Sequence, residues 1–309
     1  MSEQTFGVQS FSVSERHLLV LGDGRRSERQ RTFNGVFVLV ASLARLVRLN
    51  SGITSAAAAL ITASLVTPPI EAMEMVIITA LVIALSNGGY ALNDVCDCEI
   101  DKINQPGRPI PAGRIGELRA LDIGIGNLVA AILLSVPLSV WCITLTITDA
   151  AFLGTYAVWS KRLGLLKNIL IGYLVASGFL IGAYNFDRID PLVACLVACA
   201  FFGTIAREIV KDVQDMEGDH QYGARTLPIM FGPTIAYAAT AVCLTLCLML
   251  AAIPYFMGLV NQLYLILLLV GAGIFLIGWR IRSDSARWCQ YMIMAGSIVV
   301  LVAFAIGCT

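Results

Sequence analysis

Charged residues are scarce in this chain of 309 residues. Asp, Glu, Lys and Arg together make up 14% of the sequence, whereas hydrophobic residues make up 58%. A soluble domain usually has about one quarter charged residues, because polar groups must cover its surface. The mean hydropathy of +0.80 therefore argues against a soluble enzyme and indicates an integral membrane protein.

Histidine and regularly spaced cysteine are also lacking. The two histidines have no companion at metal-ligand spacing, and the nine cysteines are mostly scattered through apolar runs. This pattern fits neither a zinc finger nor a secreted disulfide framework, so we expect the cysteines to be small residues of membrane helices. The 21 basic residues balance the 21 acidic ones, so the net charge says little about partners. We expect no nucleic-acid partner, and no obligate protein partner is evident.

A signal peptide is missing as well. Residues 1–33 contain five arginines but no long apolar stretch with a cleavage site. We interpret this segment as a polar, basic N-terminal arm at a membrane face, followed by a transmembrane domain over residues 34–309. Residues 34–49 are apolar but carry Arg45 and Arg48, which predicts an interfacial helix leading into the first span.

Long hydrophobic runs dominate the remaining sequence. A membrane-spanning helix needs roughly 20 mostly apolar residues, and prolines and polar residues separate the runs. The sequence therefore predicts an all-α membrane protein with nine transmembrane helices. They cover residues 50–67, 73–92, 119–137, 139–159, 168–185, 191–208, 230–253, 262–279 and 288–307.

The basic residues fall almost entirely on one predicted side of the membrane. If the N-terminus is cytoplasmic, nine spans place twenty of the 21 Lys and Arg residues on the cytoplasmic side, and only Arg188 lies opposite. Lys and Arg in short loops set membrane topology in this direction. We therefore expect a multi-pass protein of the cell membrane, with the N-terminus cytoplasmic and the C-terminus outside.

Two acidic stretches interrupt the hydrophobic chain, one after the second span and one after the sixth. The first contains Asn93 and three aspartates, and the second repeats the same aspartate spacing of three and four residues. The two triplets are Asp94, Asp97 and Asp101, and Asp212, Asp215 and Asp219. On a helix this spacing places all three carboxylates of a triplet on one face, and both triplets lie on the predicted cytoplasmic side.

Three like charges on one helix face repel each other, so a purely structural role does not explain the triplets. Divalent cations would offset the repulsion, and oxygen-only ligands suit Mg²⁺, especially together with a substrate phosphate. We therefore interpret the six aspartates as catalytic residues and, together with Asn93, as metal ligands. Cys96 and Cys98 flank Asp97, but helical geometry turns them away from the aspartate face.

Basic residues accompany both acidic stretches. Magnesium held by carboxylates makes a diphosphate a good leaving group, and Lys or Arg side chains grip phosphate oxygens. The candidates are Lys102 and Arg108 near the first triplet, Arg207 and Lys211 near the second, and Lys161 in the loop between them. The alternative is that each of them only sets topology. With apolar spans to wrap an isoprenoid chain, the arrangement indicates prenyl transfer inside the membrane.

The motif Asn-Asp-x-x-Asp-x-x-x-Asp at residues 93–101, with Asp-x-x-Asp-x-x-x-Asp at residues 212–219, resembles the UbiA-type intramembrane prenyltransferases. The resemblance covers residues 45–309 and nine helices. It implies a helical bundle around a central lipid-open cavity, Mg²⁺ as cofactor and a polyprenyl diphosphate as donor.

Residues 99–115 and 207–228 resemble in particular the archaeal digeranylgeranylglyceryl phosphate synthases. That resemblance implies geranylgeranyl diphosphate as donor and a lipid phosphate, geranylgeranylglyceryl phosphate, as acceptor, as in ether-lipid biosynthesis. Chlorophyll synthases share much of the first motif, so an aromatic or chlorin acceptor remains an alternative. A membrane transporter or cation channel is the alternative from another class, because acidic residues in membranes often mark ion pathways.

The resemblance also implies roles for single residues. Asn50 resembles a polar position that lines the family cavity. The family often shows Tyr-x-x-x-Lys near the fourth span, and both residues are expected to bind substrate. Here Tyr156 and Lys161 are separated by one residue more, so the resemblance supports this role for Lys161 more than for Tyr156. Tyr90, three residues before Asn93, is placed to face an allylic cation with its ring, although ordinary helix packing also explains it.

Overall fold

The computed structural model describes residues 38–66, 70–159, 163–183, 190–221 and 223–307. The predicted arm over residues 1–33 lies outside these ranges, so its boundary at residue 33 stays a prediction. From Arg45 to the C-terminus the chain forms one compact unit. Its regular secondary structure within the described ranges is entirely helical, as the sequence predicts.

Among the described residues, eight helices are long and apolar enough to cross a membrane by themselves, and α2 adds a ninth span if it is counted together with residues 38–46. The helical membrane fold is therefore confirmed. The long helices are α2 (Leu49–Leu65), α3 (Ala72–Cys96), α5 (Glu117–Ser135), α6 (Val140–Trp159), α7 (Leu165–Gly182), α8 (Pro191–Gln214), α11 (Pro233–Phe256), α12 (Gln262–Ile281) and α13 (Ala286–Ile306). The short helices are α4 (Cys98–Asn104), α9 (Met216–Gln221) and α10 (Leu227–Phe231).

Local sequence signals explain where several helices begin. Asp190 accepts a hydrogen bond from the backbone of Leu192, 2.7 Å away, and Pro191 occupies the first turn of α8. The first N–H groups of a helix have no partner within the helix. A side chain that accepts a hydrogen bond from one of them favours a helix start, and so does a proline, which has no N–H group. Asn261 and Ser285 cap α12 and α13 in the same way. The polar residues between the apolar runs thus define the spans as much as the runs themselves.

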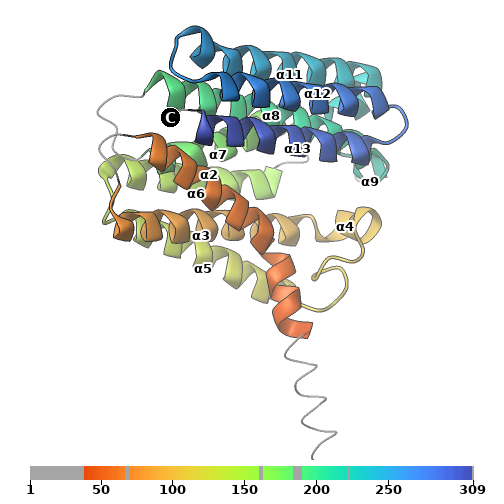
Figure 1. Cartoon of the computed structure of the whole chain (residues 1–309). Coiled ribbons are helices and arrows are strands. Elements are labelled where there is room, and N and C mark those ends of the chain that lie inside the picture. Colours follow the sequence, from red (N-terminus) through yellow and green to blue (C-terminus); the bar gives the residue numbers. More distant parts are fainter. Residues whose placement is uncertain (1–37, 67–69, 160–162, 184–189, 222, 308–309) are drawn as a thin grey trace, which may run out of the picture. The chain divides into compact units, whose positions relative to one another are not determined.

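Helices lie side by side within this unit (Figure 1), and distant ones such as α2 and α7 also pack together. α3 packs against α2 and α5, and α8 packs against both α7 and α11. α12 and α13 form an antiparallel hairpin that contacts α8 through α13. The α3 and α8 helices, which carry the acidic motifs at their ends, are therefore each held by neighbours along their length.

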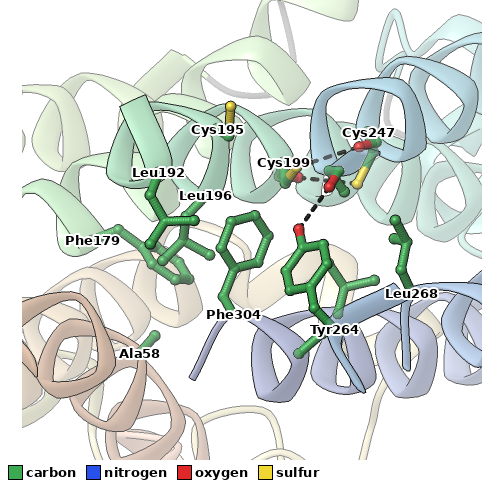
Figure 2. Packing of buried hydrophobic residues seen from close by; sticks show 13 residues of the cluster. Ala58, Phe179, Leu192, Cys195, Leu196, Cys199, Cys247, Tyr264, Leu268 and Phe304 are labelled. Carbon is green, nitrogen blue, oxygen red and sulfur yellow. Dashed lines mark hydrogen bonds between the residues drawn. The ribbon is translucent and has the colours of Figure 1, made fainter. Parts of the chain in front are cut away.

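Polar contacts to backbone carbonyls tie the helices together in the core around α8, α11 and α12 (Figure 2). The Cys199 and Cys247 thiols each donate to the other residue's carbonyl, at 3.3 and 3.5 Å. The buried Tyr264 hydroxyl donates to the carbonyl of Ala251 at 2.6 Å, and its ring meets Phe304 edge-on. In a membrane, close packing and such hydrogen bonds drive helix association, because lipid is as apolar as the core. Cys199 and Cys247 therefore join α8 to α11 through close packing and thiol hydrogen bonds.

Glycine allows α7 to approach the backbone of α2 closely. A Cβ atom added at Gly182, at the end of α7, would lie 2.1 Å from the backbone carbonyl oxygen of Ala59 in α2. Backbone cannot move aside as a flexible side chain can, so α7 and α2 would have to separate. A Cβ at Gly178, one turn earlier in α7, would meet nothing within 4 Å.

We therefore expect Gly182→Ala to destabilise the protein, while the matched control Gly178→Ala leaves its stability unchanged or slightly raised. Overpacking of this kind typically costs about 1–3 kcal/mol. Thermal unfolding of the purified variants in detergent measures the difference. Equal midpoints for the two variants would show that α2 and α7 do not approach closely at this point.

Candidate active site

The two acidic motifs lie at equivalent places, each at the end of a long helix. The α3 helix continues to Cys96 and α8 to Gln214, several residues beyond the predicted span ends at 92 and 208. The first aspartates of the motifs, Asp94 and Asp212, are therefore in the last turns of these helices and are almost fully buried. The motifs are extensions of the membrane helices rather than loops after them.

The middle aspartate interrupts the helix in both motifs. Asp97 has φ −91° and ψ 3°, and Asp215 has φ −91° and ψ 7°. This sparsely populated backbone region is common for active-site residues. The prediction of one uninterrupted helical face is wrong in this respect, because α4 and α9 begin as new helices just after these residues. Backbone hydrogen bonds four residues apart still cross each break, so the carboxylates remain near one another.

Both motifs contribute to one pocket. The ends of α3 and α8 are continued by α4 and α9, which contact each other. The fit is tight at Gly218, where an added Cβ would lie 2.2 Å from Asn104 Oδ1. The pocket is lined by Asp97, Ile100, Asp101, Asn104, Gln105, Arg108, Tyr156, Lys167, Lys211, Asp212, Asp215 and Asp219. Five of the six predicted aspartates therefore face the same space, and the sixth, Asp94, is not among the lining residues.

Two arginines hold the carboxylates of the first motif. Asp94 accepts hydrogen bonds from Arg48 at 2.8 Å and from Arg108 at 3.1 Å. Arg108 also forms an ion pair with Asp101, and the guanidinium of Arg48 lies over the ring of Tyr90, 4.6 Å from its centre. Tyr90 therefore packs against an arginine and is not among the residues that line the pocket.

Residues of α7 hold the second motif. Lys167 forms a buried ion pair with Asp212 Oδ1, and the Asn168 amide donates to Asp212 Oδ2 at 3.0 Å. One turn before Asp212 on α8, the buried Glu208 pairs with Arg207 at 2.6 Å and faces Lys211 at 3.9 Å. The side chain of Lys211 thus lies between Glu208 and the pocket.

Burial changes the acidity of two pocket carboxylates that lie outside the spans. It raises the pKa of Asp101 to about 6, because the loss of solvent outweighs the attraction of Arg108. Burial also raises the pKa of Asp215 above its usual range, against the attraction of Lys211. Perturbed carboxylates that line a pocket are typical of functional sites.

The donor set suits a hard divalent cation. Each polar side chain that lines the pocket either carries an oxygen atom that can bind a metal ion or is a positively charged Lys or Arg. Magnesium prefers carboxylate and amide oxygens as ligands. No three His, Cys, Asp or Glu side chains in the described part of the chain lie close enough together to hold an ion by themselves. A cation here would therefore complete its ligand shell with water or phosphate oxygens, as Mg²⁺ usually does.

Several other predicted residues do not line the pocket. Asn50 is exposed on α2, and Lys102 is exposed and paired with Glu99. Arg207 is partly exposed and paired with Glu208. Lys161 lies outside the described residues, so its role stays a prediction. Tyr156, whose role the spacing put in doubt, lines the pocket together with Arg108 and Lys211.

Sequence reasoning missed several residues of the site as functional candidates, among them Arg48, Lys167 and Asn168. A signal for two of them was present, because Lys167 and Asn168 begin an otherwise apolar span. Polar residues inside a membrane helix are costly and usually face a functional cavity or a partner. Arg48 had entered the argument only as a topology signal.

Comparison with known proteins agrees with this geometry. Residues 24–306 match the model of the UbiA prenyltransferase family. The chain belongs to the UbiA prenyltransferase family. Within it, the chain is 33% identical over 221 residues to the digeranylgeranylglyceryl phosphate synthase of Methanopyrus kandleri, covering 70% of this chain and 81% of that protein.

Solved structures of UbiA proteins share the fold. A structure described as digeranylgeranylglyceryl phosphate synthase in membranes superposes with a TM-score of 0.70 at 27% identity, covering 87% of this chain and 98% of that one. A UbiA homologue from Archaeoglobus fulgidus bound to GPP and Mg²⁺ superposes with a TM-score of 0.62 at 16% identity, covering 84% and 99%. At that identity, the second likeness supports the fold alone.

This UbiA protein is therefore a multi-pass membrane prenyltransferase similar to the digeranylgeranylglyceryl phosphate synthases. The prediction of a prenyltransferase is confirmed, and the transporter or channel alternative finds no support in the family match. The assignment of individual site residues rests on the geometry described above and stays a prediction.

The raised pKa of Asp101 leads to a pH-dependent stability. Because the pKa of an aspartate is near 4 in the unfolded chain and about 6 in the folded protein, the folded protein binds this proton more tightly. The stabilisation is complete below about pH 4 and is lost as pH rises through 6, by at most about 3 kcal/mol. We expect Asp101→Asn to reduce the fall in unfolding temperature between pH 4 and 7, measured in EDTA. A parallel pH profile in the variant would contradict this assignment.

Proposed function

We propose that this UbiA protein catalyses the magnesium-dependent transfer of a geranylgeranyl group from geranylgeranyl diphosphate to geranylgeranylglyceryl phosphate. The observation that carries the proposal is the single pocket lined by both aspartate motifs and by three basic side chains, Arg108, Lys167 and Lys211. The similarity to enzymes named digeranylgeranylglyceryl phosphate synthase supports this donor and acceptor.

In this proposal the pocket aspartates, together with Asn93 and Asp94, hold Mg²⁺ directly or through water. When bound, magnesium neutralises the charge that develops on the departing diphosphate. Arg108, Lys167 and Lys211 grip phosphate oxygens, Arg108 with its two-pronged guanidinium. Lys161, Lys102 and Arg207 belong to the same proposal as further contacts to substrate phosphates, the last two from outside the pocket lining. Asn50, exposed on α2, belongs to it as a polar group of the wider lipid-open cavity rather than of this pocket.

The chemical step breaks the allylic C–O bond of the donor, and its electron pair leaves with the diphosphate. The free hydroxyl of the glyceryl lipid then forms the new C–O bond and loses its proton. Tyr156 lines the pocket, so its ring can face the cation-like carbon, and Tyr90 supports Arg48 from behind. The packed helices keep water from the reacting carbon, which prevents hydrolysis of the donor.

The orientation of the protein belongs to the same proposal. The pocket lies at the ends of α3 and α8, on the side of the predicted cytoplasmic loops. The positive-inside rule then places the pocket and the N-terminus on the cytoplasmic side and the C-terminus outside. A charged diphosphate made in the cytoplasm would reach the pocket from that side without crossing the bilayer.

The acceptor is tested with one donor and a mixed pool of acceptors. We expect purified protein with Mg²⁺ and geranylgeranyl diphosphate to form one new product, the digeranylgeranyl lipid phosphate, detected by mass spectrometry. Quinone precursors and chlorins in the pool should remain unmodified. A prenylated aromatic or chlorin product would instead support the alternative acceptor, and no product at all would refute the proposed transfer.

The middle aspartates are tested by isosteric replacement. Asp97→Asn and Asp215→Asn remove charge from the pocket without removing volume, so the bundle should stay folded. We expect kcat to fall by at least about 100-fold in each variant, since the metal site loses a ligand. Asp122→Asn, on the exposed surface of α5, is the matched control and should keep normal turnover. Near-normal turnover of both pocket variants would show that Asp97 and Asp215 are not metal ligands.

A further inference from the structure

The two acidic motifs differ in one respect that their common aspartate spacing hides. The first motif begins with Asn93, directly before Asp94, whereas the second has Lys211 at the corresponding position, directly before Asp212. Lys211 faces Glu208 at 3.9 Å and lines the pocket. A lysine carries no acceptor oxygen, so the second motif contains no amide of its own at this place.

The α7 helix supplies an amide to the second motif instead. The Asn168 side chain donates from Nδ2 to Asp212 Oδ2 at 3.0 Å, just as Asn93 donates from Nδ2 to Asp97 Oδ2 at 2.9 Å. The aspartates differ, since Asn93 binds the middle residue of its triplet and Asn168 the first. Each motif is thus accompanied by one amide N–H group that fixes the orientation of a carboxylate.

The other end of each amide is unsatisfied. The Oδ1 atoms of Asn93 and Asn168 are both buried and have no hydrogen-bond partner among the described residues. Asn168 as a whole is 0% exposed. The orientation is not arbitrary, because only the amide nitrogen can donate to a carboxylate. A buried carbonyl oxygen without a partner is costly, and a hydrophobic residue would tie α7 to α8 without that cost.

We propose that Asn168 is a positioning residue of the cation site and the counterpart, for the second motif, of Asn93. Its N–H group orients Asp212, which lines the pocket. Asn168 is buried beside Asp212 and does not itself line the pocket, so its carbonyl oxygen reaches the ligand shell of the divalent cation through water. This inference rests on the proposed magnesium-dependent function. An uncharged amide oxygen suits this place, because amide carbonyls are ligands for hard cations and add no further negative charge to an acidic pocket.

The competing explanation is that Asn168 only links α7 to α8. Its neighbour Lys167 already pairs with Asp212 Oδ1 across the same interface, so the link does not depend on Asn168 alone. The two explanations differ in whether the effect of Asn168 depends on bound magnesium. A link between helices acts whether magnesium is bound or not, whereas a residue of the cation site changes the affinity for magnesium.

The experiment measures magnesium affinity without turnover. The full-length protein in detergent, with inorganic pyrophosphate at a fixed concentration, is titrated with MgCl₂ while its thermal unfolding midpoint is recorded. The concentration that gives half of the maximal shift is compared between variants. We expect Asn168→Leu to raise this concentration about 10-fold to 100-fold, as is typical when a residue that orients a metal ligand is lost.

Asn127→Leu is the matched control, because Asn127 in α5 donates only to the carbonyl of Ile123 in its own helix among the described contacts. We expect it to titrate like the unmodified protein. A half-maximal concentration for Asn168→Leu within about twofold of the control would overturn the inference. An unmodified protein that shows no shift with magnesium and pyrophosphate would instead refute the proposed function.

Asn168→Asp serves as a second variant if Asn168→Leu does not fold. The aspartate keeps an oxygen ligand but loses the N–H donor and repels Asp212. We expect a lower unfolding midpoint than that of the unmodified protein in EDTA, with a deficit that closes as magnesium is added. A deficit that stays the same at every magnesium concentration would show a purely structural role and overturn the inference.

Discussion

Carboxylates at the ends of apolar helices are stable only where something compensates for their burial, and this constraint shapes the site. An ionised carboxylate removed from water needs a hydrogen-bonded cation close by. The protein provides Arg48 and Arg108 for Asp94, and Lys167 for Asp212. Each of these pairs joins segments that are distant in sequence, so the same contacts that make the carboxylates tolerable also bring the helices around the pocket together.

The helix breaks at the middle aspartates follow from the same constraint. A continuous helix would carry the third carboxylate of each triplet further along the axis of the span. Beyond the breaks at Asp97 and Asp215, α4 and α9 contact each other, with Asn104 packed on Gly218. Asp101 and Asp219 are thereby turned into the pocket, where both are largely buried. Both motifs share this backbone geometry, so their likeness extends from the sequence to the shape of the chain.

Much of this could be predicted from the sequence, because hydropathy and spacing are local properties. The spans follow from apolar runs, and the two motifs from repeated aspartates. The partners of the aspartates could not be predicted, since Lys167 and Asp212 are 45 residues apart and only helix packing brings them together. The helix breaks were missed for a related reason, because i, i+3 and i, i+7 spacing fits a straight helix as well as a broken one. Asn50, proposed from resemblance alone, does not line the pocket.

The charge of the pocket explains why both cation and diphosphate belong to the proposed reaction. Five aspartates and three basic side chains line it, so its formal charge is −2 when all are ionised. A diphosphate alone would meet repulsion from the carboxylates despite the three basic groups. One divalent cation balances that excess, and further cations carried by the diphosphate balance its own charge. With magnesium bound, the basic side chains would be free to bind phosphate oxygens. Without it, Arg48, Arg108 and Lys167 pair with the carboxylates Asp94, Asp101 and Asp212.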